Sequence, residues 1–151
     1  MTDLQPLAVL LGQNERLRDA ATLEHQRVRA ASVAAAAQAE QLHAYQREYQ
    51  ARWQAQFQRG GQIELVHCYQ GFMERLTQAV AQQARIAEHA AAQVAHALGE
   101  LRAAELRCAS VRKLIERRTQ ELRIGADRLE QKRSDEAASR VAWDRTHEAR
   151  H

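Results

Sequence analysis

The glycine pair Gly60-Gly61 constrains this chain more than any other feature, because long segments without a strong helix breaker lie on both sides of it. The only proline, Pro6, lies near the start of the chain. Adjacent glycines indicate a turn, and both flanking segments have helical patterns. We therefore predict an all-α fold, a long antiparallel two-helix coiled-coil hairpin. Its helices are expected at about residues 6–59 and 63–143, with the turn at 60–61.

The residues on the two sides of this turn are spaced as mirror images. If the chain folds about the bond between the two glycines, residues that face each other have numbers that sum to 121. On each side, four residues spaced four, three and four apart share one helix face. The predicted facing pairs are Tyr49/Phe72, Tyr45/Leu76, Leu42/Ala79 and Gln38/Gln83. Two faces in register across one turn favour a single antiparallel unit, so one coiled-coil domain is expected over residues 1–151.

The composition is typical of a thin helical structure without a thick core. Aromatic residues make up 5% of the 151 residues, and Ala, Gln, Glu, Arg and Leu dominate. The net charge is only +3, from 22 basic and 19 acidic residues that are interspersed along the chain. Such patterning is typical of a solvated coiled-coil surface, so we expect no nucleic-acid partner.

The first helix is expected to begin with Thr2 or Asp3 as its cap, with Pro6 in the first turn. A pattern of three-and-four spacing then predicts its packing face. The pattern comprises Leu7, Leu10, Leu11, Asn14, Leu17, Ala21, Val28, Ala31, Ala35, Leu42, Tyr45 and Tyr49. Its alanine-rich middle supplies little buried area, so we expect that segment to be held weakly.

The second helix carries a column of residues at strict intervals of seven. Every member is apolar or cysteine: Val66, Met73, Val80, Ala87, Val94, Leu101, Cys108, Ile115, Leu122 and Leu129. A companion column three residues later runs from Tyr69 through Leu76, Gln83, Ala90, Ala97, Ala104 and Val111, and then reaches Arg118 and Gly125. A repeat sustained over this length indicates a left-handed coiled coil.

The companion column loses its apolar character at Arg118, and the first helix has no residues left to pair beyond about residue 115. Residues 116–143 are therefore expected to overhang the hairpin. This segment is highly charged but keeps Leu122, Leu129 and Trp143. An isolated helix of this kind is marginal in water, so it is expected to pack against another protein.

The two cysteines do not suggest a disulfide bond or a catalytic thiol. Cys68 and Cys108 lie 40 residues apart on one predicted helix, a separation of about 60 Å. Cys108 falls in the heptad column, so we interpret it as a small buried apolar residue. Free thiols suit a reducing compartment. Without a signal-peptide-like start or a run of 18 apolar residues, a cytoplasmic protein with no membrane insertion is expected.

No pattern for catalysis is present in the sequence. There is no glycine loop for phosphate and no nucleophile-elbow motif. The seven histidines lack the spacing of metal ligands, and a two-helix hairpin encloses no pocket. We expect a protein that is not an enzyme and needs neither cofactor nor metal.

The apolar surface near the turn is wider than a two-helix contact requires. Phe72, Ala79 and Ile86 flank the predicted seam on the second helix, while Trp53 and Phe57 extend the aromatic set of the first. One interpretation is a thickened core at the tip. The other is a docking surface for a partner, because tyrosines are frequent anchors at interfaces.

These features together resemble the flagellar FliJ family, the small coiled-coil proteins of the type III export ATPase, to which injectisome stalk proteins are related. The resemblance covers nearly the whole chain. It is carried by the length, the leucine-rich start, the Tyr45-x-x-x-Tyr49 pair, the segment Tyr69-Gln70-x-Phe72-x-x-x-Leu76 and the stretch from Arg128 to Glu136.

The resemblance implies a non-catalytic stalk whose end with the two termini inserts into the hexameric export ATPase and promotes assembly of its ring. A patch toward the turn would contact the transmembrane export gate protein. By position, that patch is Gln38, Leu42, Tyr45, Tyr49, Phe72, Leu76, Ala79 and Gln83. Gln83 replaces a residue that is often histidine in relatives, so a pH-sensitive role is not expected there. In the overhang, Arg118, Leu122, Leu129 and Arg133 are the predicted ring contacts.

The resemblance also implies export chaperones as partners, and a location at the cytoplasmic face of the inner membrane during flagellum assembly. Two alternatives remain at this point. One is the equivalent stalk protein of a virulence injectisome. The other is a scaffold coiled coil that only self-associates and affects no ATPase.

Overall fold

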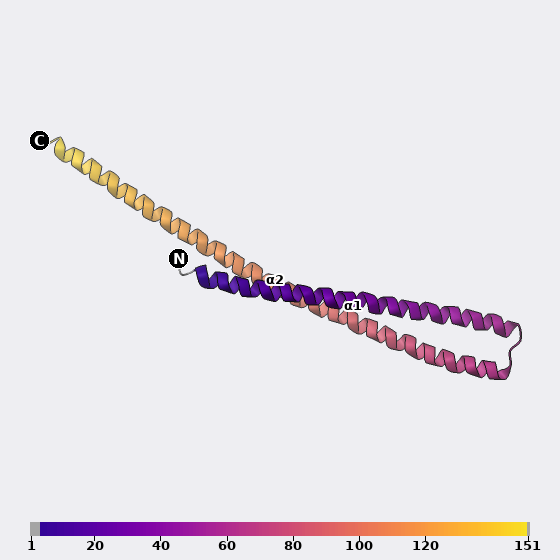
Figure 1. Cartoon of the computed structure of the whole chain (residues 1–151). Helices are drawn as coiled ribbons and strands as arrows, with labels where there is room; N and C mark the ends of the chain where they lie inside the picture. The colour runs from indigo at the N-terminus through magenta and orange to yellow at the C-terminus, as the bar shows by residue number, and fades with distance from the viewer. Residues whose placement is uncertain (1–3, 151) are drawn as a thin grey trace. The chain divides into compact units, whose positions relative to one another are not determined.

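The computed structural model describes residues 4–150, which form two long α-helices (Figure 1). Helix α1 spans Leu4–Gln58 and helix α2 spans Ile63–Glu148. The chain reverses between them, and the described residues contain no strand. The predicted antiparallel helical hairpin is therefore confirmed.

The helix bounds differ slightly from the sequence prediction. Helix α1 begins two residues earlier than predicted, and the proposed caps Thr2 and Asp3 lie outside the described residues. Helix α2 continues five residues past Trp143, to Glu148. No glycine or proline follows Trp143, and Arg145 and His147 in the last turn interact favourably with the negative end of the helix dipole. Nothing in the sequence ends the helix at Trp143, and α2 continues to Glu148.

The two glycines of the turn are needed for different reasons. Gly60 has a φ of 101°, a conformation that L side chains rarely adopt. Gly61 lies against a ring, because a Cβ atom there would be 2.8 Å from Cδ1 of Phe57. The amides of Arg59 and Gly60 donate to the carbonyls of Gln56 and Phe57 at 3.1 and 3.2 Å, which closes the end of α1.

The described residues group into two compact units, Leu17–Ala104 and a second formed by the two chain ends. The first unit contains the turn and the arms on either side of it. The second comprises residues up to Arg16 together with Glu105 onward. The expectation of a single coiled-coil domain stays a prediction.

In the first unit, α1 and α2 pack through columns of residues at intervals of seven. On α2 the companion column is the more deeply buried one, since Leu76, Ala90, Ala97 and Ala104 are its members with relative exposures of 9% or less. The predicted main column, from Val66 to Leu101, is half-buried. On α1 the buried positions Val28 and Ala35 are also seven apart. The seam predicted from the sequence is thus present, with the companion column at its centre.

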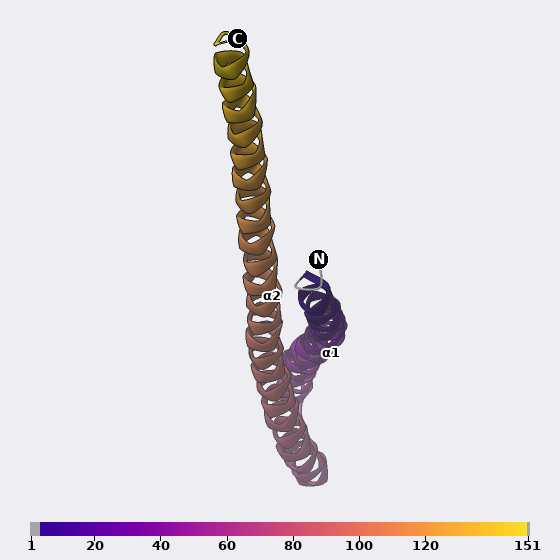
Figure 2. The same ribbon diagram turned by 90° about the vertical axis from the view of Figure 1, so that its left-hand side faces the viewer.

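In the second unit, the start of α1 packs beside the part of α2 that ends at Ile115. Cys108 is fully buried there and Val111 is 8% exposed, while Arg112 and Glu15 approach to 3.6 Å across the two helices. Every described residue from Glu116 onward is exposed. Figure 2 shows this final part of α2 without another segment beside it. The predicted overhang, with paired packing that ends near residue 115, is confirmed.

Replacing Gly60 by alanine is expected to lower the free energy of unfolding by about 1–2 kcal/mol, because the positive φ is costly for an L residue. Gly99→Ala is the matched control. It lies within α2 with open space around the added methyl group, so it should stabilise the protein by up to about 1 kcal/mol. Urea denaturation of both variants measures the difference. A Gly60→Ala protein as stable as the unsubstituted chain would contradict this account of the turn.

The cysteines are expected to differ in reactivity, since Cys68 is exposed and Cys108 is buried. In the native protein a maleimide reagent should modify Cys68 quickly, and it should modify Cys108 only after denaturation. Mass spectrometry of the modified peptides identifies the positions. Rapid labelling of Cys108 under native conditions would show that the packing of α1 against α2 opens readily at this point.

Candidate partner-binding surface

The eight residues predicted to bind the export gate occupy two kinds of position. Half of them belong to the columns that form the seam: Leu42, Tyr49, Leu76 and Gln83. The other half flank the seam on one side of the hairpin: Gln38, Tyr45, Phe72 and Ala79. Leu76 is buried at 8% exposure, Gln38 and Tyr45 are exposed, and the remaining five are half-buried. The predicted patch is therefore a strip in which packing residues alternate with accessible ones.

Two of the four predicted facing pairs are in direct contact. The side chain of Gln83 donates from Nε2 to Oε1 of Gln38 at 3.2 Å and to the carbonyl of Ala35 at 3.4 Å. The rings of Tyr49 and Phe72 have their centroids 4.4 Å apart. Both pairs have residue numbers that sum to 121, so the register deduced from the spacing holds on this stretch.

Five aromatic rings form a continuous cluster at the turn end of the hairpin. Neighbouring centroids among Tyr49, Trp53, Phe57, Tyr69 and Phe72 are 4.4–6.3 Å apart. All five residues are half-buried. Such pairs add stabilisation beyond the area they bury, so the thickened core that the sequence suggested is present here. Tyr45 contacts this cluster only through Tyr49, at 5.5 Å, and is 45% exposed.

One side of the hairpin exposes several large apolar side chains to solvent. We call this the open side. On each helix it comprises the column that flanks the seam, seven residues apart: Leu17, Glu24, Ala31, Gln38 and Tyr45 on α1, and Phe72, Ala79, Ile86, Gln93 and Glu100 on α2. Leu17, Tyr45 and Ile86 are 57%, 45% and 47% exposed. Because a two-helix seam covers only the columns between the helices, these side chains are left in contact with water.

The flanking columns on the opposite side of the seam are more polar. They hold Thr22, Arg29, Ala36, His43 and Gln50 on α1, and Gln70, Thr77, Ala84, Ala91 and Leu98 on α2. A cross-helix hydrogen bond lies on this side, where Nε2 of Gln46 donates to the hydroxyl of Thr77 at 3.0 Å. The two sides therefore differ in chemistry, and the open side is the better candidate for an apolar contact.

The sequence prediction assigned part of the open side to the packing face of α1, and this was wrong. Leu10, Leu17, Ala31 and Tyr45 are exposed. Their place in the seam is taken by a second column at intervals of seven, in which every residue is half-buried. That column is Leu4, Leu11, Arg18, His25, Ser32, Ala39, Gln46 and Trp53. Four of its members are polar, so a search for apolar periodicity found only Leu11 of this column.

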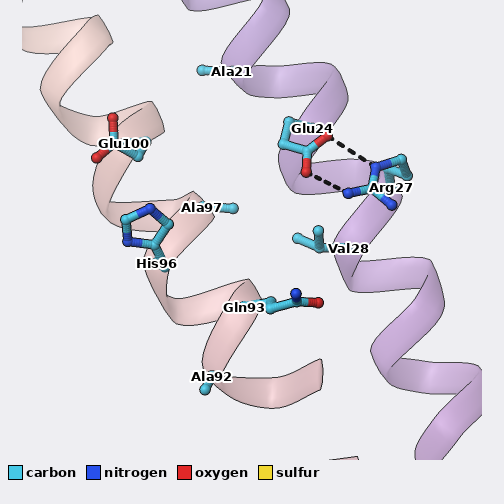
Figure 3. A pocket seen from close by; sticks show the side chains of 9 residues that line it. All are labelled: Ala21, Glu24, Arg27, Val28, Ala92, Gln93, His96, Ala97 and Glu100. Carbon is cyan, nitrogen blue, oxygen red and sulfur yellow. Dashed lines mark hydrogen bonds and ion pairs between the residues drawn. The ribbon is translucent and has the colours of Figure 1, made fainter. Parts of the chain in front are cut away.

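Two hollows open on the open side. The first, of about 500 Å³, is lined by Gln38, Gln41, Leu42, Tyr45 and Gln83, which are mostly residues of the predicted patch. The second, of about 460 Å³, lies farther from the turn, and its lining includes Ala21, Val28 and Ala97 (Figure 3). At the second hollow the seam residues are small, so the side chains of the two helices leave the space between them unfilled.

A charged pair stands at the rim of the second hollow. Arg27 donates from Nε and Nη2 to the two carboxylate oxygens of Glu24 at 2.9 and 2.6 Å. These hydrogen bonds, helped by the positive charge of Arg27, lower the pKa of Glu24 below its ordinary value. Both side chains are more than half exposed, so the arrangement is a solvent-exposed ion pair within one turn of α1.

The predicted ring contacts Arg118, Leu122, Leu129 and Arg133 all lie on the overhang and are all exposed. Their spacing of four, seven and four places them along one face of α2. Leu122 and Leu129 are 47% and 51% exposed. A single helix with an apolar strip between arginines can form both apolar and ionic contacts with a surrounding protein.

A comparison with protein families matches residues 3–147 to the flagellar FliJ protein. The chain belongs to the FliJ family. Comparisons with curated proteins and with solved structures find no match. The FliJ family is a non-catalytic component of the flagellar export apparatus, and the chain is accordingly a flagellar export-related protein of the stalk type.

The described residues of this FliJ-family chain add two observations on its surface. Over residues 4–150, neither helix is apolar enough over a sufficient length to cross a membrane. Within the same range, no three His, Cys, Asp or Glu side chains come together in a way that could hold a metal ion.

Tyr45 and Tyr49 are expected to differ in their effect on stability, although they are neighbours on one helix. Tyr49→Ala removes a ring from the aromatic cluster and should lower the free energy of unfolding by about 2 kcal/mol. Tyr45→Ala removes an exposed ring and should change it by less than about 0.5 kcal/mol. Urea denaturation of the two variants makes the comparison. An equal loss for both would mean that Tyr45 is a structural residue rather than an accessible one.

Proposed function

We propose that this protein is the non-catalytic central-stalk and coupling subunit of a bacterial flagellar type III protein export ATPase. In this role the overhang of α2 enters the hexameric ATPase ring and promotes its assembly. The eight-residue strip described above, half of it in the seam columns and half on the open side, contacts the transmembrane export gate protein. The protein then works at the cytoplasmic face of the inner membrane, with export chaperones as additional partners.

The overhang carries the proposal for the ring. Packing against α1 ends at Ile115, yet α2 continues to Glu148, and every residue from Glu116 to Glu148 is exposed. A helix of 33 residues beyond the paired region is about 50 Å long, which is long enough to reach deep into a ring. Since a single helix in water is only marginally stable, surrounding protein would stabilise this part of α2.

The open side supports the proposal for the gate. Tyr45 is accessible, whereas the ring of its neighbour Tyr49 packs against the ring of Phe72, with the two centroids 4.4 Å apart. A partner therefore meets an aromatic anchor on a rigid base, which lowers the conformational entropy lost on binding. Gln83 bonds to Gln38 and to the backbone of Ala35, so its amide serves to position the strip and does not titrate.

A scaffold that only self-associates is the competing hypothesis. The exposed apolar side chains of the open side favour it in part, because two copies could cover them from water. The two hypotheses differ in a simple way. A stalk changes the activity of its ATPase, whereas a scaffold does not.

The decisive experiment measures ATP turnover by the purified cognate export ATPase with the full-length protein and with a protein that ends at Ile115. We expect stimulation by the full chain, and turnover at the level of the ATPase alone with the truncated chain. Two point variants sharpen the test. Leu122→Glu changes the proposed contact face and should reduce stimulation. Ile124→Glu changes a residue of similar exposure, 44% against 47%, on another face and should not.

No stimulation by the full-length protein, with an ATPase that is active and forms rings, would reject the stalk. An equal loss with Leu122→Glu and Ile124→Glu would reject the assigned contact face. Circular dichroism of each variant controls for loss of helix.

A further inference from the structure

We propose that, within the unit Leu17–Ala104, α1 has two rotational settings against α2, and that Trp53 selects the observed one. A change of setting turns α1 about its own axis, so that the column on its open side enters the seam and the second seam column leaves it. The exposure of Leu17 and Tyr45 therefore depends on the setting of α1. Because both settings are properties of the hairpin alone, this device does not depend on the ATPase or on the gate protein.

The two columns that exchange lie on either side of the column through Val28, whose side chain points toward α2 (Figure 3). On the open side this column is Leu17, Glu24, Ala31, Gln38 and Tyr45, and the second seam column here is Arg18, His25, Ser32, Ala39 and Gln46. At 3.6 residues per turn the two columns are about 100° apart, so their exchange turns the middle of the packing face by about 50°. Gln38 already accepts a hydrogen bond from Gln83 on α2 at 3.2 Å. The open column therefore lies at the rim of the seam, and a small rotation brings it in.

Hydrophobicity favours the other setting over most of this length. Three of the five residues in the open column are apolar, against only Ala39 among the five of the second seam column. Yet Leu17 and Tyr45 are 57% and 45% exposed, while Arg18, His25 and Ser32 are half-buried. Burial stabilises apolar side chains and costs free energy for polar groups that lose water. The composition of both columns thus opposes the observed setting in this stretch.

The preference reverses at the next position of each column, which is Arg52 for the open column and Trp53 for the second seam column. Arg52 is exposed and forms an ion pair with Glu48 at 2.8 Å. Trp53 is half-buried, with its ring centroid 5.3 Å from that of Tyr69 on α2 and 5.4 Å from that of Phe57. The indole is the largest side chain in either column, and turning α1 to the other setting would take it out of the seam. Trp53 therefore holds α1 in the observed setting from its turn end.

A hydrogen bond across the seam supports the same setting. Nε2 of Gln46, in the second seam column, donates to the hydroxyl of Thr77 at 3.0 Å, and the rotation would move Gln46 away from α2. The glycine pair of the turn gives the backbone the freedom that such a rotation needs. One helix thus carries two packing faces with opposed preferences along its length. Two packings of this kind can exchange when a single contact changes.

The test compares the maleimide reaction rates of Ala31→Cys and Ser32→Cys, each made in the full-length protein with Cys68→Ser. Ala31 is exposed and Ser32 is half-buried, so the Ala31→Cys protein should react faster while Trp53 is present. With Trp53→Gln added, we expect the order to reverse and the ratio of the two rates to fall at least about tenfold. Mass spectrometry separates these products from any reaction at Cys108, which is buried.

Tyr49→Gln is the matched control for the loss of a ring. Tyr49 belongs to the same aromatic cluster, but it lies in the column through Val28, which packs against α2 in both settings. This variant should therefore weaken the cluster and keep the order of the two rates.

A second variant favours the other setting and leaves the cluster intact. Glu24→Leu adds an apolar residue to the open column and should lower the ratio of the two rates, whereas Gln26→Leu, at an exposed position outside both columns, should not. Circular dichroism shows whether each variant keeps its helix content. With Trp53→Gln folded, an unchanged order of rates overturns the proposal, and so does an equal rise of both rates, which means that the helices separate rather than rotate. If Trp53→Gln loses its helix content, Glu24→Leu decides alone, and an unchanged ratio there overturns the proposal.

Discussion

The contact between α1 and α2 is the interaction on which each compact unit depends, and it has a limited capacity. Two helices can bury only the columns that face each other. In the unit from Leu17 to Ala104, the most deeply buried positions are Val28, Ala35, Leu76, Ala90, Ala97 and Ala104. Small residues allow close helix approach but bury little area. Other apolar side chains therefore remain on the surface unless a further protein covers them.

This limit explains the difference between the turn end and the middle of the hairpin. Near the turn, aromatic rings from both helices fill the seam and extend beyond it, so the helices are held together by large side chains. Toward Ala21 and Ala97 the same columns carry small residues, and a hollow remains beside them. A rigid aromatic end and a less completely packed middle thus follow from residue size at equivalent positions of one repeat.

The split of the predicted patch has the same origin. Tyr45 and Tyr49 look alike in sequence, yet one falls in a flanking column and the other in a seam column. Tyr49 consequently meets Phe72, while Tyr45 faces water. An alternation of this kind couples a binding surface directly to the packing beneath it, since Gln38 and Tyr45 each have a seam residue one turn away.

Much of the fold could be predicted because it depends on local signals. The glycine pair located the turn, the repeat at intervals of seven located the seam, and its loss at Arg118 located the end of pairing. Each of these is a property of residue type at a regular spacing. Of the second seam column of α1, the predicted packing face contained only Leu11, because its members Arg18, His25, Ser32 and Gln46 are polar. Periodicity in hydrophobicity does not detect a column that is buried by position rather than by composition.

The sequence by itself therefore determined that the chain forms two long antiparallel helices, where it turns and where α2 loses its partner. Helix propensity, turn conformation and heptad spacing are encoded locally. Only the tertiary structure decided which neighbouring column of α1 enters the seam, which side of the hairpin stays apolar and exposed, and where small residues leave a hollow. The two candidate columns lie on either side of the column that contains Val28, so the choice between them is a rotation of α1 about its own axis, and that rotation is set by how the two helix surfaces fit together.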